Sequence, residues 1–243
     1  MKEVRKSLLV LCIAAVGLSA TAGSIAFIVW SWPRLPASDL PGATRAEKAA
    51  DVALVSLLAL NHLVFHACPL SRWLHARLGG CQRSAYAFLR GVLLVALAVF
   101  WVPWGGPGLA HSAVLLWLAR AAFTLGILLH LLATAALGNA ALLGYDALLR
   151  RIQGSPPLPI WANERIVVAG PFASTRHPDA LALMVLFLSG AFFQKERLLL
   201  AVGACLWILA TALAKERRRL AFLGPAWAEH RRRTGFLLPR RPA

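Results

Sequence analysis

The sequence predicts an all-α protein of the membrane: a polytopic bundle of four spanning helices followed by a C-terminal helical hairpin. Of its 243 residues, 59% are hydrophobic and only 15% are charged, whereas a soluble domain carries about 25% charged residues. Apolar runs close to the ~20 residues that a helix needs to cross a bilayer recur along the whole chain. Composition and run length together argue against a soluble globular domain.

The predicted elements follow from these runs. The four spans cover residues 7–32, 49–68, 86–104 and 113–137, and the hairpin is formed by two apolar runs at 180–193 and 198–214. The run at 180–193 is too short to cross comfortably alone, so the hairpin dips into or crosses the bilayer as a pair. A short amphipathic helix is expected at 140–151. We expect an N-terminal region of transmembrane helices (1–138) and a C-terminal region (139–243) with the hairpin and a basic tail.

The basic residues lie beside the apolar runs. The formal net charge is +16, but no interleaved basic and aromatic pattern of a nucleic-acid module is present. The positive-inside rule and anionic lipid headgroups account for the charge instead. Counting lysine and arginine by loop places both termini, the second loop and residues 138–176 in the cytoplasm. We therefore expect an integral protein of a bacterial inner membrane whose partner is the lipid bilayer.

The stretch at 169–178 places several chemical groups directly before the first hairpin run. It contains the turn signal Gly170-Pro171, then Phe172 and the basic pair Arg176 and His177. Pro178 follows, where a first-turn proline is tolerated because its missing N–H would have no helical partner. Polar groups at the mouth of a membrane helix are costly unless they bind something. We expect this segment to bind a small charged cofactor at the membrane surface.

The order of motifs in the last third resembles the isoprenylcysteine carboxyl methyltransferase superfamily. That family shows Gly-x-Tyr, Arg-His-Pro-x-Tyr, a pair of glutamates, Gly-x-x-Tyr-x-x-Tyr and a basic run that ends near a proline. The matching residues here are Gly170-Pro171-Phe172, Arg176-His177-Pro178, Glu216, Gly224-x-x-Trp227-x-x-His230 and Pro239. The stretches 61–69 and 83–86 are similar to methanethiol S-methyltransferases and NnrU-type membrane proteins. The resemblance covers roughly residues 55–240.

The resemblance implies S-adenosylmethionine as the cofactor and a small or lipophilic thiol, amine or carboxylate as the methyl acceptor. It implies Glu216 and Arg176 as catalytic residues. The implied cofactor-binding residues are Ile166, Val167, Gly170, Phe172, Arg176, His177, Pro178, Trp227 and His230. Asn61, His62 and His66 are the tentative acceptor residues. No metal is assigned.

Physical chemistry agrees with these roles. Arg176 or His177 suits the cofactor's carboxylate, helped by the positive end of the following helix. Phe172 and Trp227 offer ring faces for adenine, or for the sulfonium through a cation–π contact of about 0.5–2 kcal/mol. Glu216 would orient the acceptor or hold the cofactor's amino group. The acceptor would enter from the lipid and the cofactor from the cytosol.

Departures from the family pattern keep two other hypotheses open. Ala180 stands where many relatives have an aromatic residue, Lys215 replaces the first of two glutamates, and His230 replaces a tyrosine. These changes favour a non-catalytic NnrU-type binding or assembly protein as the second hypothesis.

The third hypothesis is a haem or metal protein. His62 and His66 share one helix face, because they are four residues apart. The same pair could instead line an acceptor site or form hydrogen bonds within the bundle, and His130 in the fourth span is the only further ligand candidate.

Overall fold

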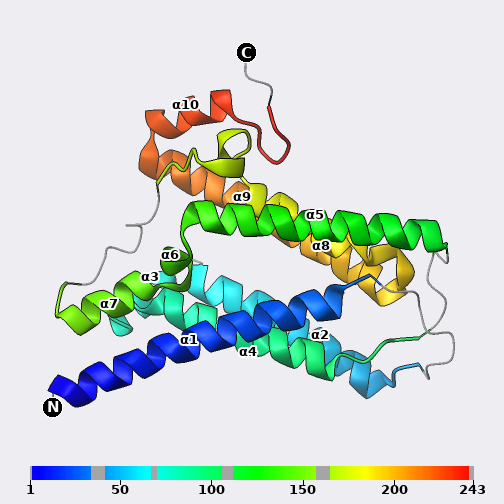
Figure 1. Ribbon diagram of the computed structural model, residues 1–243, viewed down its shortest axis with the longest axis horizontal. Helices are drawn as coiled ribbons and strands as arrows, with labels where there is room; N and C mark the ends of the chain where they lie inside the picture. Colours follow the sequence, from blue (N-terminus) through cyan, green and yellow to red (C-terminus); the bar gives the residue numbers. More distant parts are fainter. Residues whose placement is uncertain (1, 34–41, 67–69, 106–111, 157–164, 241–243) are drawn as a thin grey trace. The chain divides into compact units, whose positions relative to one another are not determined.

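The computed structural model describes residues 2–33, 42–66, 70–105, 112–156 and 165–240 (Figure 1). Within these ranges the chain forms ten α-helices, two short 3-10 helices and a single isolated β-bridge. The predicted all-α class is therefore confirmed. Parts of three predicted loops, at 34–41, 106–111 and 157–164, lie outside the described residues, as does the end of the second predicted span at 67–68.

Five of the described helices are long and apolar enough to cross a membrane. They are α1 (Lys2–Ser31), α2 (Arg45–His66), α4 (Gln82–Phe100), α5 (Ala113–Leu137) and α9 (Lys195–Leu223). In the most apolar window of each, only 11–22% of the residues are buried. Their outer surfaces are covered by leucine, valine and other apolar side chains, which is what a lipid-facing surface requires. The polytopic membrane bundle is confirmed.

The hairpin is asymmetric. Its first helix, α8 (Pro178–Ser189), has only 12 residues and is followed by the 3-10 turn η2 (Ala191–Phe193). Its second helix, α9, has 29 residues and is long enough to span by itself. α9 extends beyond the predicted run at 198–214 at both ends, because the flanking lysines, arginines and glutamates have high helix propensity and continue the helix.

One compact unit contains α1, α2, α4 and three short helices: α3 (Leu70–Arg77), α6 (Asn139–Leu143) and α7 (Tyr145–Gln153). The amphipathic helix predicted at 140–151 is thus two helices that meet at Gly144. Gly144 has φ +73°, and a Cβ there would lie 2.7 Å from the backbone nitrogen of Ser84. Ser84 Oγ donates a hydrogen bond of 2.9 Å to the Gly144 carbonyl. This close contact with α4 breaks the helix, and the amphipathic pattern gave no sign of it.

The other unit contains α5, α8, α9 and α10 (Pro225–Arg233), together with the 3-10 turn η1 (Gly170–Ala173). α8 packs against both α5 and α9, as Figure 1 shows in green, yellow and orange. At the α5–α8 contact, a Cβ on Gly126 would lie 3.1 Å from the Leu186 side chain. Pro178 opens α8 at its first turn, as the sequence predicts. The division predicted from the sequence, into an N-terminal transmembrane region (1–138) and a C-terminal region (139–243), stays a prediction.

Helices α1 and α4 approach each other through two glycines. A Cβ on Gly23 would lie 2.6 Å from Gly91 Cα, and a Cβ on Gly91 would overlap the carbonyl of Ser19. Ser19 Oγ also donates to the Phe88 carbonyl at 3.1 Å. Small residues that let two backbones touch are typical of helix contacts in membranes, where no hydrophobic effect drives association.

We predict that Gly91→Ala destabilises the protein by about 1–3 kcal/mol, because the new methyl group forces α1 away from α4. The measurement is the thermal unfolding midpoint of the purified protein in detergent. Gly203→Ala in α9 is the matched control, since nothing lies within 4 Å of its Cβ position. An alanine there should leave the midpoint unchanged or raise it slightly. Equal midpoints for the two variants would contradict the glycine contact.

Candidate functional site

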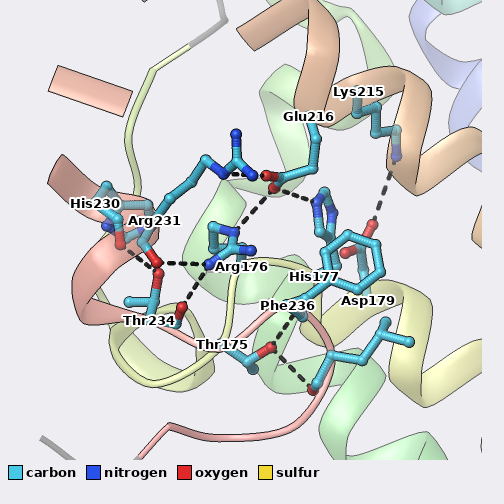
Figure 2. Close-up of polar contacts among 11 residues, drawn as sticks. Thr175, Arg176, His177, Asp179, Lys215, Glu216, His230, Arg231, Thr234 and Phe236 are labelled. Carbon is cyan, nitrogen blue, oxygen red and sulfur yellow. Dashed lines mark hydrogen bonds and ion pairs between the residues drawn. The ribbon is translucent and has the colours of Figure 1, made fainter. Parts of the chain in front are cut away.

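The site is built around the carboxylate of Glu216, which is buried with 6% of the residue exposed. α9 carries this glutamate, and the segment just before α8 carries Arg176 and His177. Arg176 Nε lies 3.0 Å and His177 Nε2 lies 2.9 Å from the same oxygen, Glu216 Oε1 (Figure 2). A buried carboxylate is tolerated only when it is paired and hydrogen-bonded. Arg176 and His177, which are adjacent in the sequence, together provide the ion pair and the hydrogen bonds.

Arg176 also holds the C-terminal segment. Its Nη1 donates to the carbonyl oxygens of Thr234 and of Arg231, the latter at 3.1 Å. The backbone N–H of Arg176 donates to the Gly235 carbonyl at 2.9 Å, beside an isolated parallel bridge between Thr175 and Gly235. Only 8% of Arg176 is exposed. Its guanidinium therefore joins three pieces of chain: the start of α8, the end of α9 and the segment after α10.

His177 is held from both sides and is only 2% exposed. Its backbone N–H donates to the Phe236 carbonyl at 3.2 Å, and its ring meets the Phe236 ring edge-on at a centroid distance of 5.1 Å. Burial lowers the pKa of His177, against the opposing effect of its hydrogen bond with Glu216. The imidazole is thus neutral at pH 7. Because a carboxylate can only accept, Nε2 carries the proton and donates it to Glu216.

An aromatic group on α10 borders this cluster. Trp227 is 1% exposed, and its ring lies 5.2 Å from that of His230 and 5.0 Å from the guanidinium carbon of Arg219. The indole Nε1 is buried and has no hydrogen-bond partner among the described residues. Buried hydrogen-bond donors nearly always have an acceptor, so the indole N–H is available to donate to a bound molecule. Burial also lowers the pKa of His230, and the nearby Arg176 cation lowers it further.

The second oxygen of Glu216 is less committed than the first. Arg231 Nε lies 3.2 Å from Oε2 as an ion pair, but Oε2 accepts no hydrogen bond from any part of the chain that the structure describes. The Arg231 side chain is 44% exposed, and the contact with Glu216 is its one ion pair within the described residues. Glu216 Oε2 and Trp227 Nε1 are therefore one buried acceptor and one buried donor that a bound molecule could use.

The other sequence-predicted residues are distributed as follows. Phe172 is buried in η1, which packs on α5, and Gly170 begins that turn with φ +56°. Ile166 and Val167 lie half-buried in the irregular segment before it. Asn61 and His62 belong to the other compact unit, and the side chain of His66 lies outside the described residues.

Asn61 and His62 on α2 lie in an environment separate from the Glu216 cluster. His62 Nδ1 lies 3.2 Å from the Tyr86 hydroxyl, and the two rings meet edge-on. Asn61 is 5% exposed, and neither atom of its amide has a partner among the described residues. Among the side chains described, no group of three or more His, Cys, Asp or Glu residues could hold a metal ion.

Sequence reasoning missed the part that the C-terminal segment plays. Thr175 Oγ1 lies 3.1 Å from the Phe236 carbonyl and 2.9 Å from the Leu237 carbonyl, which fixes the segment beside Arg176. Nothing in the sequence distinguishes Arg231 from the other arginines of the basic tail. The only available signal was Thr234-Gly235-Phe236, a short uncharged interruption of the basic run.

Comparison with known proteins adds to this geometry. The chain is 26% identical over 191 residues to a Bradyrhizobium diazoefficiens protein named methanethiol S-methyltransferase 2, which covers 78% of this chain and 72% of that protein. It is 28% identical over 195 residues to a Mycobacterium tuberculosis protein named methanethiol S-methyltransferase, with 78% and 77% covered. The predicted resemblance is confirmed. No family model and no solved structure matches the chain.

The methanethiol S-methyltransferase relatives and this chain match over most of both lengths. The similarity is therefore not confined to the C-terminal motifs, and it extends over residues of both compact units, since 78% of the chain is more than either unit holds.

We predict that Glu216→Gln loosens the contact between Arg176 and the segment at 234–237. Removing one partner of a buried ion pair leaves an uncompensated charge and costs about 3–5 kcal/mol. Amide hydrogen exchange at Arg176, His177 and Gly235 should become faster. Glu229→Gln is the matched control, because Glu229 pairs with Arg232 and Arg233 on an exposed surface of α10. The control should leave exchange unchanged; equal protection in both variants would rule out this role of Glu216.

We predict that acidification destabilises the protein in the range just below pH 6.5, the ordinary pKa of histidine. Because the folded pKa of His177 is lowered, the unfolded chain binds more protons in this range, so stability rises with pH. The contribution is fully present above pH 6.5 and is lost as the pH falls through the lowered pKa. The thermal midpoint of the wild type between pH 5 and 7.5 measures it. His177→Gln should flatten part of that slope, and an unchanged slope would contradict a buried neutral His177.

Proposed function

We propose that the chain is an integral-membrane methyltransferase that transfers a methyl group from S-adenosylmethionine to a small or lipophilic acceptor. The similarity to two proteins named methanethiol S-methyltransferase supports a membrane methyltransferase with a small acceptor. The single structural observation that carries the cofactor proposal is the Glu216 cluster. It brings together a buried carboxylate, the buried cation of Arg176, the neutral His177 and a tryptophan beside the apolar helices α8 and α9.

The residues of the cluster fit this cofactor by their chemistry. Glu216 Oε2 is a buried acceptor suited to an ammonium group, and Arg231 is a cation suited to a carboxylate. Trp227 supplies a ring, and its N–H, which has no partner among the described residues, suits a purine nitrogen. When bound, S-adenosylmethionine supplies an activated methyl group on a sulfonium.

Arg176 and His177 act in this proposal chiefly as positioning residues. Their hydrogen bonds fix the Glu216 carboxylate and hold the segment at 234–237 in place. Positioning supplies much of the rate of a transfer reaction, because the acceptor must be aligned with the group it attacks. Direct contact of Arg176 with the cofactor remains part of the proposal, through its Nη2.

Several parts of the proposal concern the acceptor and the compartment. A thiol, amine or carboxylate that approaches from the lipid suits the apolar helices. Asn61, His62 and His66 are kept in the proposal as acceptor-binding residues. The excess of lysine and arginine in selected loops favours both termini in the cytoplasm of a bacterial cell.

A non-catalytic NnrU-type binding protein is the second candidate. The observation that favours it is the mutual satisfaction of Arg176, His177 and Glu216, which is also what a purely structural ion cluster would show. A haem or metal protein built on His62 and His66 remains the third. A purified sample without a Soret band and without metal by elemental analysis would end that alternative.

We predict that purified protein binds S-adenosylmethionine saturably in isothermal titration calorimetry. Trp227→Ala and Glu216→Gln should each weaken binding about tenfold or more, since each removes a buried group that the cofactor would use. Arg232→Gln, on the exposed face of α10, is the matched control and should bind like the wild type. Absence of saturable heat in the wild type would contradict the cofactor.

A second arm separates catalysis from binding. Incubation with labelled S-adenosylmethionine and a panel of thiols, amines and carboxylates should give a methylated product, identified by mass spectrometry. Binding without any product would favour the non-catalytic candidate.

A further inference from the structure

A hollow of about 340 Å³ lies between α3 and α7, far in sequence from the Glu216 cluster and confined to the unit that contains α1, α2 and α4. Figure 1 shows these two short helices next to each other. Arg77 from the last turn of α3 lines it, with Arg150 and Arg151 from the last turn of α7 and Ser155 after that helix. The remaining lining residues are alanine and glycine, so the hollow has arginine walls and a small-residue floor.

The charges around the hollow do not balance. None of the described residues that line it is acidic. The C-terminal ends of α3 and α7 each carry about half a negative charge, which offsets only part of three guanidinium groups. Asp146 belongs to the first turn of α7, outside the lining, and forms no ion pair with Arg150 within the described residues. An excess of positive charge is left on three solvent-exposed guanidinium groups, and a bound anion would be attracted to it.

The three arginine side chains differ in how many contacts they make with the rest of the protein. Arg151 Nη1 donates to the Leu78 carbonyl at 3.2 Å, and Gly79 makes room for it, since a Cβ there would lie 3.0 Å from that nitrogen. Arg77 stacks over Trp73, with its guanidinium carbon 5.6 Å from the ring centroid. The carbonyl of Arg150 accepts from the backbone of Ser155, but the Arg150 side chain forms neither a hydrogen bond nor an ion pair with any described residue. The Arg151 side chain is thus held by a hydrogen bond, while the guanidinium N–H groups of Arg77 and Arg150 are mostly available to a ligand.

The hollow sits at one end of the α2–α4 pair. α3 and the glycine turn after it connect α2 to α4, two helices long enough to span a bilayer that pack against each other. Around this connection Trp73 is 55% exposed, Leu70 42% and Leu149 45%. Exposed tryptophan and leucine next to arginines mark the level where a bilayer passes from acyl chains to headgroups.

From this combination we propose that the hollow binds a phosphate group, which in the membrane is the headgroup phosphate of an anionic phospholipid. Arginine donors match phosphate oxygens in pairs, and a phosphate supplies the missing negative charge. A cavity of this size is sufficient for a phosphate with its glycerol, and the exposed leucines offer a surface for the acyl chains. The proposal is independent of the Glu216 cluster and of methyl transfer.

The test compares lipid retention by two double variants of the full chain. Wild type, Arg77→Gln/Arg150→Gln and the control Arg45→Gln/Arg72→Gln are purified from mixed vesicles of phosphatidylcholine and phosphatidylglycerol, and bound lipid is counted by native mass spectrometry. The control removes the same charge, from the start of α2 and from a part of α3 outside the lining. We expect retained phosphatidylglycerol to fall roughly tenfold in the first variant only. Circular dichroism and the thermal midpoint show that each variant is folded.

A second arm identifies the source of the phosphate. Wild type in pure phosphatidylcholine nanodiscs is titrated with inorganic phosphate. Binding that is sensitive to Arg77→Gln/Arg150→Gln in either arm supports the phosphate site, and the arm in which it occurs tells lipid from free anion. Binding in neither arm, or equal loss of lipid in both double variants, overturns the proposal.

Discussion

One buried carboxylate organises the C-terminal unit. Glu216 Oε1 accepts from Arg176 and His177 at 3.0 and 2.9 Å, and Arg176 also donates to the carbonyls of Arg231 in α10 and of Thr234 directly after it. A buried ion cluster contributes less to net stability than its Coulomb energy suggests, because desolvation offsets most of the gain. The cluster connects α8, α9 and the segment at 234–237 through hydrogen bonds of one guanidinium and one imidazole.

The same cluster changes how the sequence motif Arg176-His177-Pro178 is understood. Proline sets the start of α8, histidine is a neutral donor to Glu216, and arginine connects separate segments. Two buried atoms near the motif have no hydrogen-bond partner among the described residues, and both lie on other side chains: Glu216 Oε2, which forms an ion pair with Arg231, and Trp227 Nε1. The residues of a motif can therefore contribute to a binding site by holding other side chains in place, while those other side chains contact the bound molecule.

Hydropathy predicted the membrane helices well, because a run of about 20 apolar residues has few alternatives to a spanning helix. It failed where the outcome depended on tertiary contact. The predicted amphipathic helix is split at Gly144, whose carbonyl accepts a hydrogen bond from Ser84 of α4. Helix α9 continues through charged residues at which a hydropathy profile would end the helix. In the site, Arg176, His177, Glu216 and Trp227 could be chosen from their order along the chain. The bond between Arg176 and Glu216, and the part played by Thr234 and Gly235, depend on residues 40 and 58 positions apart, for which a local pattern carries no information.

The parallel bridge between Thr175 and Gly235 has a consequence for how the protein is made. During synthesis, Arg176 leaves the ribosome long before its carbonyl acceptors, which are 55 and 58 residues later. Until they arrive, α8 enters the membrane with a cation at its mouth that has no settled partner. Closing so long a stretch of chain is slow compared with forming local helices. The contacts of Arg176 with Glu216 and with Thr234 are thus among the last of their unit to form, after α5 and α8 have been synthesised.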